Sequence, residues 1–240
     1  MPDKVVIIPT YNEKENIEKI IRATLALPER FDILVVDDSS PDGTMAIVTE
    51  LVRLFPERVF LEVRKIKDGL GRAYIHGFKW ALEHGYDYIF EMDADFSHNP
   101  NDLPRLLDAC QNGADMAVGS RYAQGVNVVN WPMKRVLLSY FASKYVRLVT
   151  NLPIHDTTAG FVCYTRKALE SLDLSQIKFK GYGFQIEMKY KIWKKNLPIV
   201  EVPIIFTDRT LGESKISNSI VKEAVFGIIG LRIRNIFGKL

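Results

Sequence analysis

The sequence lacks several features that would place it in a special class of protein. It has only two cysteines, Cys110 and Cys163, each in an apolar context, so buried free thiols are favoured over a disulfide. The formal net charge of +3 is too small to predict binding to nucleic acid, which needs a concentrated basic patch. No internal repeat or low-complexity stretch occurs. With 47% hydrophobic and 25% charged residues, the composition predicts an ordinary globular protein.

A hydrophobic run long enough to cross a membrane is also lacking. The first residues, Met1 to Lys4, lead directly into an apolar stretch, without the basic segment and apolar run of a secretory leader. Near the other end, the uninterrupted apolar run 224–231 is far shorter than the ~20 residues that a membrane span requires. We therefore expect the body of the protein to stay in the cytoplasm.

Strand-like and helix-like segments alternate along the chain. Continuous apolar runs, rich in β-branched residues, are typical of strands that are buried on both faces. The predicted strands are 5–8, 33–36, 59–63, 87–90, 116–118, 160–164 and 199–206. Apolar residues at helical spacing follow the first strands, and 134–150 and 185–195 are further predicted helices. Alternation with short connections predicts an α/β fold, with a mostly parallel sheet and helices on both of its faces.

Acidic residues follow three of the predicted strands: Glu13, the pair Asp37 and Asp38, and the pair Asp93 and Asp95. In parallel sheets, ligands bind beyond the carboxyl ends of the strands, so these loops share one edge. Carboxylates gathered there would repel each other without a cation. Asp93 and Asp95 could hold Mg²⁺ or Mn²⁺, with the remaining ligand positions left for substrate phosphates. The alternative is that the two aspartates serve only as a turn or a helix cap.

Three further motifs have plain structural interpretations. Asn99 to Asp102 is typical of a helix cap with proline at the first helical position, and His98 beside it is predicted to be a surface or capping side chain. Gly69-Leu70-Gly71 follows the third strand and not the first, so we predict a turn that lets the backbone approach the substrate, and no dinucleotide site. Asn12 and Glu13 also suit a helix N-terminus.

Eight segments, in order and covering almost the whole body, together resemble one family. They are Pro9–Glu13, Val35–Thr44, Gly69–Gly71, Asp93–His98, Gly119–Tyr122, Asp156–Phe161, Gly181–Glu187 and Asp208–Lys215. The chain resembles the inverting GT-A glycosyltransferases, and within them the dolichyl-phosphate (polyprenol-phosphate) mannosyltransferases. The resemblance implies a GT-A, Rossmann-like fold.

The resemblance also implies a site for a nucleotide sugar. Asp95 is implied as a catalytic residue and, with Asp93, as a ligand of Mg²⁺ or Mn²⁺, while Asp42 would brace the second loop. Some relatives carry glutamine in place of Ser97, which leaves its part in the metal site open. Arg209 and Lys215 would grip the diphosphate, the alternative being plain surface charges. The implied substrate-binding residues are Pro9, Tyr11, Glu13, Asp38, Asp93, Ala94, Arg209 and Lys215.

The acceptor implied by the resemblance is a polyprenyl (dolichyl-type) monophosphate. A phosphate monoester is already ionised, since its second pKa is about 6, so no general base is needed. Arg121 and Arg135 are the implied catalytic contacts to this phosphate, because arginine binds phosphate through two hydrogen bonds. We expect inverting transfer of mannose from GDP-mannose. The alternatives are glucose or another hexose from a UDP-sugar, and a nucleotide-sugar-binding membrane protein without catalysis.

A membrane lipid as acceptor implies contact with a membrane surface. We expect residues 1–215 to form the catalytic domain and residues 216–240 a basic amphipathic helix that docks on the cytoplasmic face of a membrane. The helix 134–150 would lie beside it. For both helices the alternative is packing on the core or on a partner. Some relatives carry membrane spans and others rely on small membrane subunits; this chain resembles the single-domain kind.

Overall fold

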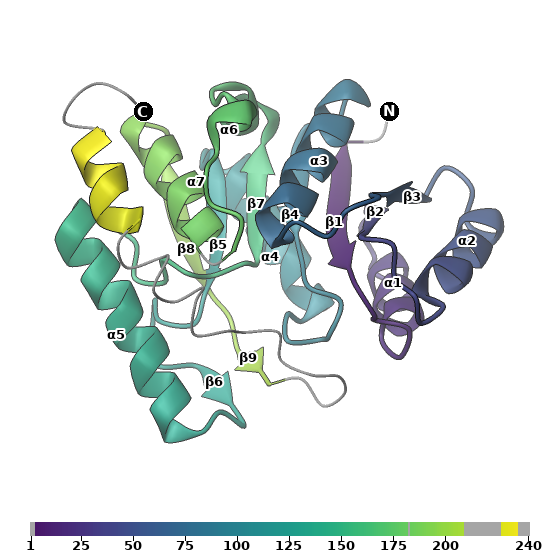
Figure 1. Ribbon diagram of the computed structural model, residues 1–240, viewed down its shortest axis with the longest axis horizontal. Helices are drawn as coiled ribbons and strands as arrows, with labels where there is room; N and C mark the ends of the chain where they lie inside the picture. Colours follow the sequence, from purple (N-terminus) through teal and green to yellow (C-terminus); the bar gives the residue numbers. More distant parts are fainter. Residues whose placement is uncertain (1–2, 182, 209–226, 235–240) are drawn as a thin grey trace.

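The computed structural model describes residues 3–181, 183–208 and 227–234. In this part of the chain, seven strands form one sheet in the order β3-β2-β1-β4-β7-β5-β8 (Figure 1). The strands are β1 (Lys4–Thr10), β2 (Asp32–Asp37), β3 (Val59–Val63), β4 (Tyr88–Glu91), β5 (Met116–Ser120), β7 (Val162–Thr165) and β8 (Ile199–Pro203). Only β7 runs antiparallel to its neighbours, β4 and β5. The predicted mostly parallel sheet is therefore confirmed.

The predicted last strand, 199–206, is in fact two strands. The first, β8, ends at Pro203, and the amide of the next residue, Ile204, still donates to the Ser120 carbonyl of β5 at 3.0 Å. The second, β9 (Phe206–Thr207), pairs in parallel with β6 (Val128–Val129) in a separate small sheet. This second sheet lies beyond the carboxyl end of β8 (Figure 1).

Helices cover both faces of the large sheet, as predicted. They are α1 (Ile17–Leu25), α2 (Thr44–Leu54), α3 (Leu70–Glu83), α4 (Leu103–Gln111), α5 (Met133–Thr150), α6 (Arg166–Glu170) and α7 (Gly183–Lys194), with short 3-10 helices η1 (Pro100–Asp102) and η2 (Leu174–Gln176). Apolar residues of α1, α2 and α4 pack on one face with Val6 and Ile8 of β1. Those of α3, α6 and α7 pack on the other face with Val5 and Ile7. Alternate residues of β1 thus serve two cores, which explains its continuous apolar run.

The strand order changes direction beside β1. From β1 the chain proceeds outward through β2 to β3, then crosses to β4 on the other side of β1. The loops after β1 and β4 therefore leave neighbouring strands in opposite directions. In open α/β sheets this switch point is where ligands bind. The predicted acidic loops lie at this position.

The helix α5 lies at one end of the molecule, beside a second helix at residues 227–234 (Figure 1). Ile228 packs there against Val146 of α5 and Ile186 of α7. The Arg232 guanidinium donates to the Thr150 carbonyl at 3.3 Å. The rest of the predicted helix 216–240 is outside the described residues. Its described part is helical and packs one side against the core.

Two features of the composition have structural counterparts. Among the described residues, no helix is both long enough and apolar enough to cross a membrane. Cys110 and Cys163 are buried free thiols on α4 and β7, as predicted.

Candidate functional site

Hydrogen bonds join the loops that follow β1 and β2. The buried Asp37 carboxylate accepts from the Thr10 hydroxyl at 2.7 Å and from the Ser40 amide at 2.7 Å. The Ser40 hydroxyl in turn accepts from the Asn12 amide at 3.0 Å. Asn12 itself has a positive φ of 58°, a turn conformation that asparagine tolerates. The acidic residue Asp37 is therefore a structural tie between the two loops.

Asp42 braces the second loop, as predicted. Its carboxylate accepts from the Thr44 amide at 3.0 Å and from the Thr44 hydroxyl at 2.6 Å. It also accepts from the Lys14 amide at 3.1 Å, which connects it to the first loop. The amide of Glu13 donates to the same Thr44 hydroxyl at 3.0 Å. These hydrogen bonds join the two loops into one wall at the carboxyl ends of β1 and β2.

Two of the predicted donor-binding residues on this wall have charged neighbours. Asp38 is buried and lies 3.1 Å from a guanidinium nitrogen of Arg64, while burial raises the pKa of its carboxyl. The Lys67 ammonium lies 3.5 Å from the centre of the Tyr11 ring, a cation–π contact. Pro9 belongs to β1 itself, paired with Val36. The side chains predicted to bind a nucleotide therefore sit in a mixed-charge environment.

The loop after β4 carries the two predicted metal ligands. β4 ends at Glu91, and the chain turns sharply at Phe96, which has a positive φ of 59°. The amide of Ser97 donates to Asp95 at 3.0 Å, so Asp95 also stabilises the turn. The Asp93 side chain is 39% exposed, whereas Asp95 and Ala94 are buried. The Tyr74 hydroxyl approaches Asp93 from α3, with 3.5 Å between the oxygens.

Asp93 and Asp95 fit a hard divalent cation for which the protein would supply only some of the ligands. No group of three or more histidine, cysteine or acidic side chains in the described ranges is placed to hold a metal ion. Two carboxylates on a partly exposed loop suit Mg²⁺ or Mn²⁺, whose other ligands are waters and substrate phosphates. The expected donor set is therefore present as carboxylates, and the substrate would complete it.

His98 is buried, and the prediction of a surface or capping side chain was wrong. The turn at Phe96 directs the imidazole under the loop, where it stacks on Phe161 with 4.9 Å between ring centres. Its Nδ1 accepts from the Asp93 amide at 3.2 Å. Burial lowers the pKa of His98 to about 4. A neutral histidine thus supports the loop that carries Asp93 and Asp95.

Arg121, the first predicted contact to the acceptor phosphate, is buried in an ion pair. Its Nε and Nη2 donate to the two oxygens of Asp156 at 2.7 and 2.6 Å. Nη2 also donates to the Thr158 hydroxyl at 2.8 Å. The cationic group is therefore fixed in orientation by the loop before β7.

Arg135, the second predicted contact, lies close by. Its Nη1 donates to Asp208 at 2.8 Å, and its guanidinium lies 4.1 Å from the centre of the Trp131 ring. The Arg121 guanidinium lies 5.4 Å from the same ring and 5.5 Å from that of Phe206. Trp131 thus connects the two arginines.

Phe206 connects the arginines to the loop that carries Asp93 and Asp95. Its ring packs edge-on against His98, with 5.5 Å between the centres, and His98 accepts from Asp93. The structure therefore brings predicted site residues from three segments together, namely Asp93 on its loop, Arg121 and Arg135. Arg209 and Lys215 lie outside the described residues.

Gly69 and Gly71 allow a close approach within the chain itself. A side chain at Gly71 would lie 2.8 Å from the Phe184 ring, and one at Gly69 would lie 2.8 Å from the Lys180 carbonyl oxygen. The Gly71 amide donates to that carbonyl at 2.8 Å. The two glycines therefore let this turn pack closely on Lys180 and Phe184, which are distant in the chain, and approach to a substrate stays a prediction.

A second group of polar side chains lies buried beneath the site. Gln185 donates to Glu91 at 2.5 Å, and the Tyr164 hydroxyl donates to the other Glu91 oxygen at 3.2 Å. Lys189 donates to the Ala159 carbonyl at 2.6 Å. Burial raises the pKa of Glu91 and lowers that of Lys189. No role for Glu91 or Lys189 was predicted from the sequence.

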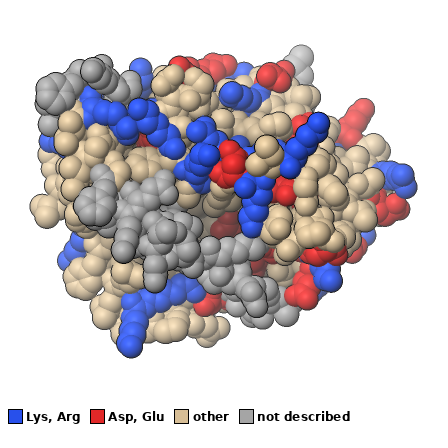
Figure 2. Space-filling view, in the orientation of Figure 1, with Lys and Arg blue, Asp and Glu red and all other residues tan. Residues whose placement is uncertain are grey.

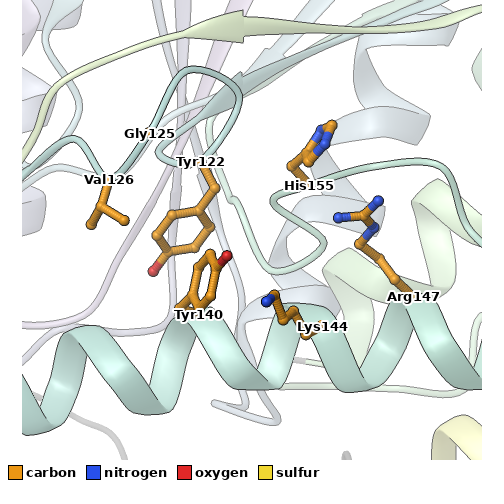
Figure 3. A pocket seen from close by; sticks show the side chains of 7 residues that line it. All are labelled: Tyr122, Gly125, Val126, Tyr140, Lys144, Arg147 and His155. Atoms are coloured by element: carbon orange, nitrogen blue, oxygen red, sulfur yellow. The ribbon is translucent and has the colours of Figure 1, made fainter.

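A small pocket of about 190 Å³ opens beside α5. Figure 3 shows Tyr122 and Tyr140 side by side at one end, with Lys144, Arg147 and His155 toward the other. The lining therefore combines two tyrosines with the basic side chains of Lys144, Arg147 and His155. Figure 2 shows the side chains on one whole face of the molecule. Near the middle of this face, acidic side chains are set back in a hollow, below a band of Lys and Arg.

Several contributors to the site were missed from the sequence because their partners are distant in the chain. Arg64 pairs with Asp38, His98 stacks on Phe161, and Trp131 contacts the Phe206 ring as well as Arg135, four residues along the chain. The spacing of Gln185 and Lys189, four residues apart on a helix, could have indicated one buried polar face.

Comparison with known proteins gives a consistent result. The family model described as glycosyl transferase family 2 matches residues 5–173. The polyprenol monophosphomannose synthase of Mycolicibacterium smegmatis is 50% identical over 231 residues, 96% of this chain and 87% of that protein. The undecaprenyl-phosphate mannosyltransferase of Micrococcus luteus is 48% identical, over 93% of this chain and 91% of that protein. The dolichol-phosphate mannosyltransferase of Pyrococcus furiosus is 40% identical, over 91% of this chain and 60% of that longer protein.

Solved structures support the same fold. The glucosyl-3-phosphoglycerate synthase of Mycobacterium tuberculosis, solved with Mn²⁺, UDP-glucose and phosphoglyceric acid, superposes with a TM-score of 0.70. The match covers 97% of this chain and 79% of that one, at 16% sequence identity. At this identity the likeness shows the GT-A fold alone, which confirms the fold class predicted from the sequence.

Proposed function

The chain belongs to glycosyl transferase family 2, and we propose that it transfers mannose from GDP-mannose to a polyprenyl monophosphate, giving polyprenyl-phosphate mannose. One observation carries the proposal. Asp93 and Asp95, the carboxylates proposed to bind a cation, lie on a loop that is linked through His98 and Phe206 to the guanidinium of Arg121. Similarity to three enzymes named as mannosyltransferases or mannose synthases of lipid phosphates, over most of the chain, supports mannose and the lipid.

The donor lies against the loops after β1, β2 and β4. Tyr11, Glu13 and Asp38 on the first wall take the nucleoside, and Asp93 with Asp95 takes the diphosphate side. A bound Mg²⁺ or Mn²⁺ supplies positive charge that stabilises the departing diphosphate. Arg209 and Lys215 are proposed to contact the same diphosphate.

The acceptor phosphate lies on the side of Arg121 and Arg135. An oxygen of the ionised phosphate attacks the anomeric carbon as the bond to the diphosphate breaks, which inverts the configuration. No proton has to be removed, so the work of the protein is to align two anionic substrates and to stabilise charge. Arg121, held by Asp156 and Thr158, offers a guanidinium that needs no reorientation.

The acceptor is a membrane lipid, so α5 is proposed to meet the membrane surface from the cytoplasmic side. Along α5 the exposed apolar side chains are Met133, Leu137, Leu138, Phe141 and Leu148. Lys144 and Arg147 on the same helix add positive charge for anionic headgroups. The segment 216–240 is proposed to join this surface. Small membrane subunits are proposed as partners, which co-purification tests.

A donor panel tests the proposal. The protein is incubated with Mg²⁺ or Mn²⁺, a polyprenyl phosphate and labelled GDP-mannose, UDP-glucose or other UDP-hexoses, and the lipid phase is analysed. We expect lipid-linked product with GDP-mannose. Product only with a UDP-sugar would replace the donor, and no product with any donor would leave a binding protein without catalysis.

A further inference from the structure

Lys189 is a fully buried lysine in the middle of α7. Its ammonium donates to the Ala159 carbonyl at 2.6 Å and to the Gln185 side-chain oxygen at 3.4 Å. A third contact, at 3.3 Å, goes to the Gln185 carbonyl one helical turn earlier. Burying an ammonium is unfavourable unless hydrogen bonds and an opposite charge compensate for lost water. The position therefore needs a reason beyond packing, because an apolar side chain of similar size would fill the same space.

Toward β4, Lys189 is connected to the loop that carries Asp93 and Asp95. Gln185 accepts from Lys189 with its oxygen and donates with its amide nitrogen to Glu91 at 2.5 Å. Glu91 is the last residue of β4, two positions before Asp93, and it also accepts from Tyr164 at 3.2 Å. The amide of Gln185 can make both contacts in only one orientation. This chain of bonds therefore fixes the end of the strand that presents the Asp93 loop.

Toward β7, Lys189 is connected to the guanidinium of Arg121. Ala159, whose carbonyl accepts from Lys189, closes a turn by donating its amide to the Asp156 carbonyl at 3.5 Å. The side chain of Asp156 holds Arg121 through both guanidinium contacts. Glu91, Lys189, Asp156 and Arg121 are all buried, and their two positive and two negative charges balance.

We propose that Lys189 is a positioning residue that fixes the Asp93 loop and the Arg121–Asp156 pair relative to each other, through Gln185 and Glu91 on one side and Ala159 on the other. The role deepens the proposed function, since these two groups are the donor and acceptor sides of the transfer. It differs from simple neutralisation of Glu91. Neutralisation needs only a nearby charge, whereas positioning needs the bond to Ala159.

Two variants separate the two roles. Lys189→Met removes the charge and the donors but keeps an unbranched chain. In Lys189→Met alone, the Glu91 carboxylate would lose its counter-charge. The double variant Glu91→Gln/Lys189→Met removes that carboxylate as well, and the Gln185 amide can turn to pair with the amide introduced at position 91. Replacing both members of a buried charge pair is commonly tolerated in folding. Lys191→Met is the matched control, because Lys191 lies on the same helix but contacts the Gln176 carbonyl and Glu187.

Trp131 provides a readout that does not depend on turnover. Its ring lies 5.4 Å from the Arg121 guanidinium, so its emission reports on movement of that group. In a Trp80→Phe/Trp193→Phe background it is the only tryptophan of the chain. We expect shifted Trp131 emission in Lys189→Met and in the double variant, and unchanged emission in Lys191→Met.

Kinetics with polyprenyl phosphate provide the second readout. We expect Lys189→Met to unfold at lower urea concentration than the parent, and the double variant to unfold at the parent's midpoint. The kcat of the double variant should nevertheless stay about 100-fold below that of the parent, the loss typical of a small misplacement of reacting groups. Parent-like emission and kcat in the double variant would reduce Lys189 to a counter-charge and overturn the proposal. If the parent itself shows no transfer, the proposed function fails, while the Trp131 measurement still decides the positioning role.

Discussion

Arg121 and Asp156 form a bidentate ion pair that is almost entirely removed from solvent, with contacts of 2.7 and 2.6 Å. Asp156 also accepts from the backbone amide of Arg121 at 2.9 Å. One carboxylate therefore fixes both the main chain at the end of β5 and the guanidinium that follows it. The pair makes Arg121 a charge of fixed position next to the Asp93 loop.

Removing one member of this pair should be costly. We expect Asp156→Ala to lower the free energy of unfolding by about 3–5 kcal/mol, because Arg121 stays buried without its partner. Urea denaturation measures the loss. The exposed pair Arg22–Glu18, at 2.8 Å on α1, is the control, and Glu18→Ala should cost less than about 1 kcal/mol.

A paired variant separates stability from transfer. Arg121→Met/Asp156→Leu should recover most of the lost stability, since both charges are gone, yet should transfer little mannose. Recovery of transfer together with stability would show that Arg121 is structural and does not bind the acceptor.

The metal role of Asp95 can be separated from its role in the turn. Asp95→Ala removes the acceptor of the Ser97 amide, whereas Asp95→Asn keeps an oxygen there and removes the charge. We expect both variants to lose Mn²⁺-dependent binding of GDP, by about 100-fold or more, and the Asn variant to keep the parent's thermal stability. Calorimetric titration of Mn²⁺ and GDP measures the binding. Full metal-dependent binding in Asp95→Asn would remove Asp95 from the metal site.

The fold was predictable from the sequence because its signals are local. The run from Val5 to Ile8 is apolar at every position since both faces of β1 are covered, and the acidic loops mark the carboxyl ends of the strands. The antiparallel direction of β7 has no such local signal. It depends on which strands become neighbours, and the sequence pattern of a buried strand is the same in either direction.

The site was predictable only where chemistry follows directly from residue type and position. Asp93 and Asp95, or Arg121, suit phosphate and metal wherever they lie on that edge. His98 and Lys189 have functions defined by what surrounds them, namely Phe161 and Asp93 for the first and Ala159 and Gln185 for the second. The contacts with Phe161 and Ala159 join distant segments, 63 residues apart for His98 and Phe161, so the local spacing of Gln185 and Lys189 could indicate a buried polar face but not its partners.

Buried His98 predicts acid sensitivity. Its pKa is lowered by burial from 6.5 to about 4, so between these values the unfolded chain binds more protons than the folded one. The contribution to stability is therefore complete above pH 6.5 and is lost as the pH falls toward 4, by about 3 kcal/mol at most. We expect His98→Asn, whose oxygen can replace Nδ1 as acceptor of the Asp93 amide, to flatten this dependence.

Urea denaturation of both proteins from pH 7.5 to 4, without divalent metal, measures the difference. Parallel curves for the parent and His98→Asn across that range would show that His98 does not contribute to the acid sensitivity.

Contact with the membrane is predicted to depend on the apolar side of α5. Leu137 and Phe141 are 47% and 58% exposed and lie one helical turn apart, so they face the same surface. Burying each side chain in the interface is worth about 1.5–3 kcal/mol, so Leu137→Ser/Phe141→Ser should weaken binding to phosphatidylglycerol vesicles by about 100-fold or more. Leu54→Ser on α2 removes an equally exposed leucine, at 54%, from the opposite end of the molecule and should leave binding intact.

Because a soluble short-chain acceptor needs no vesicle, the double variant should use it as well as the parent does. Equal vesicle binding by the double variant and the parent would place the membrane contact outside α5.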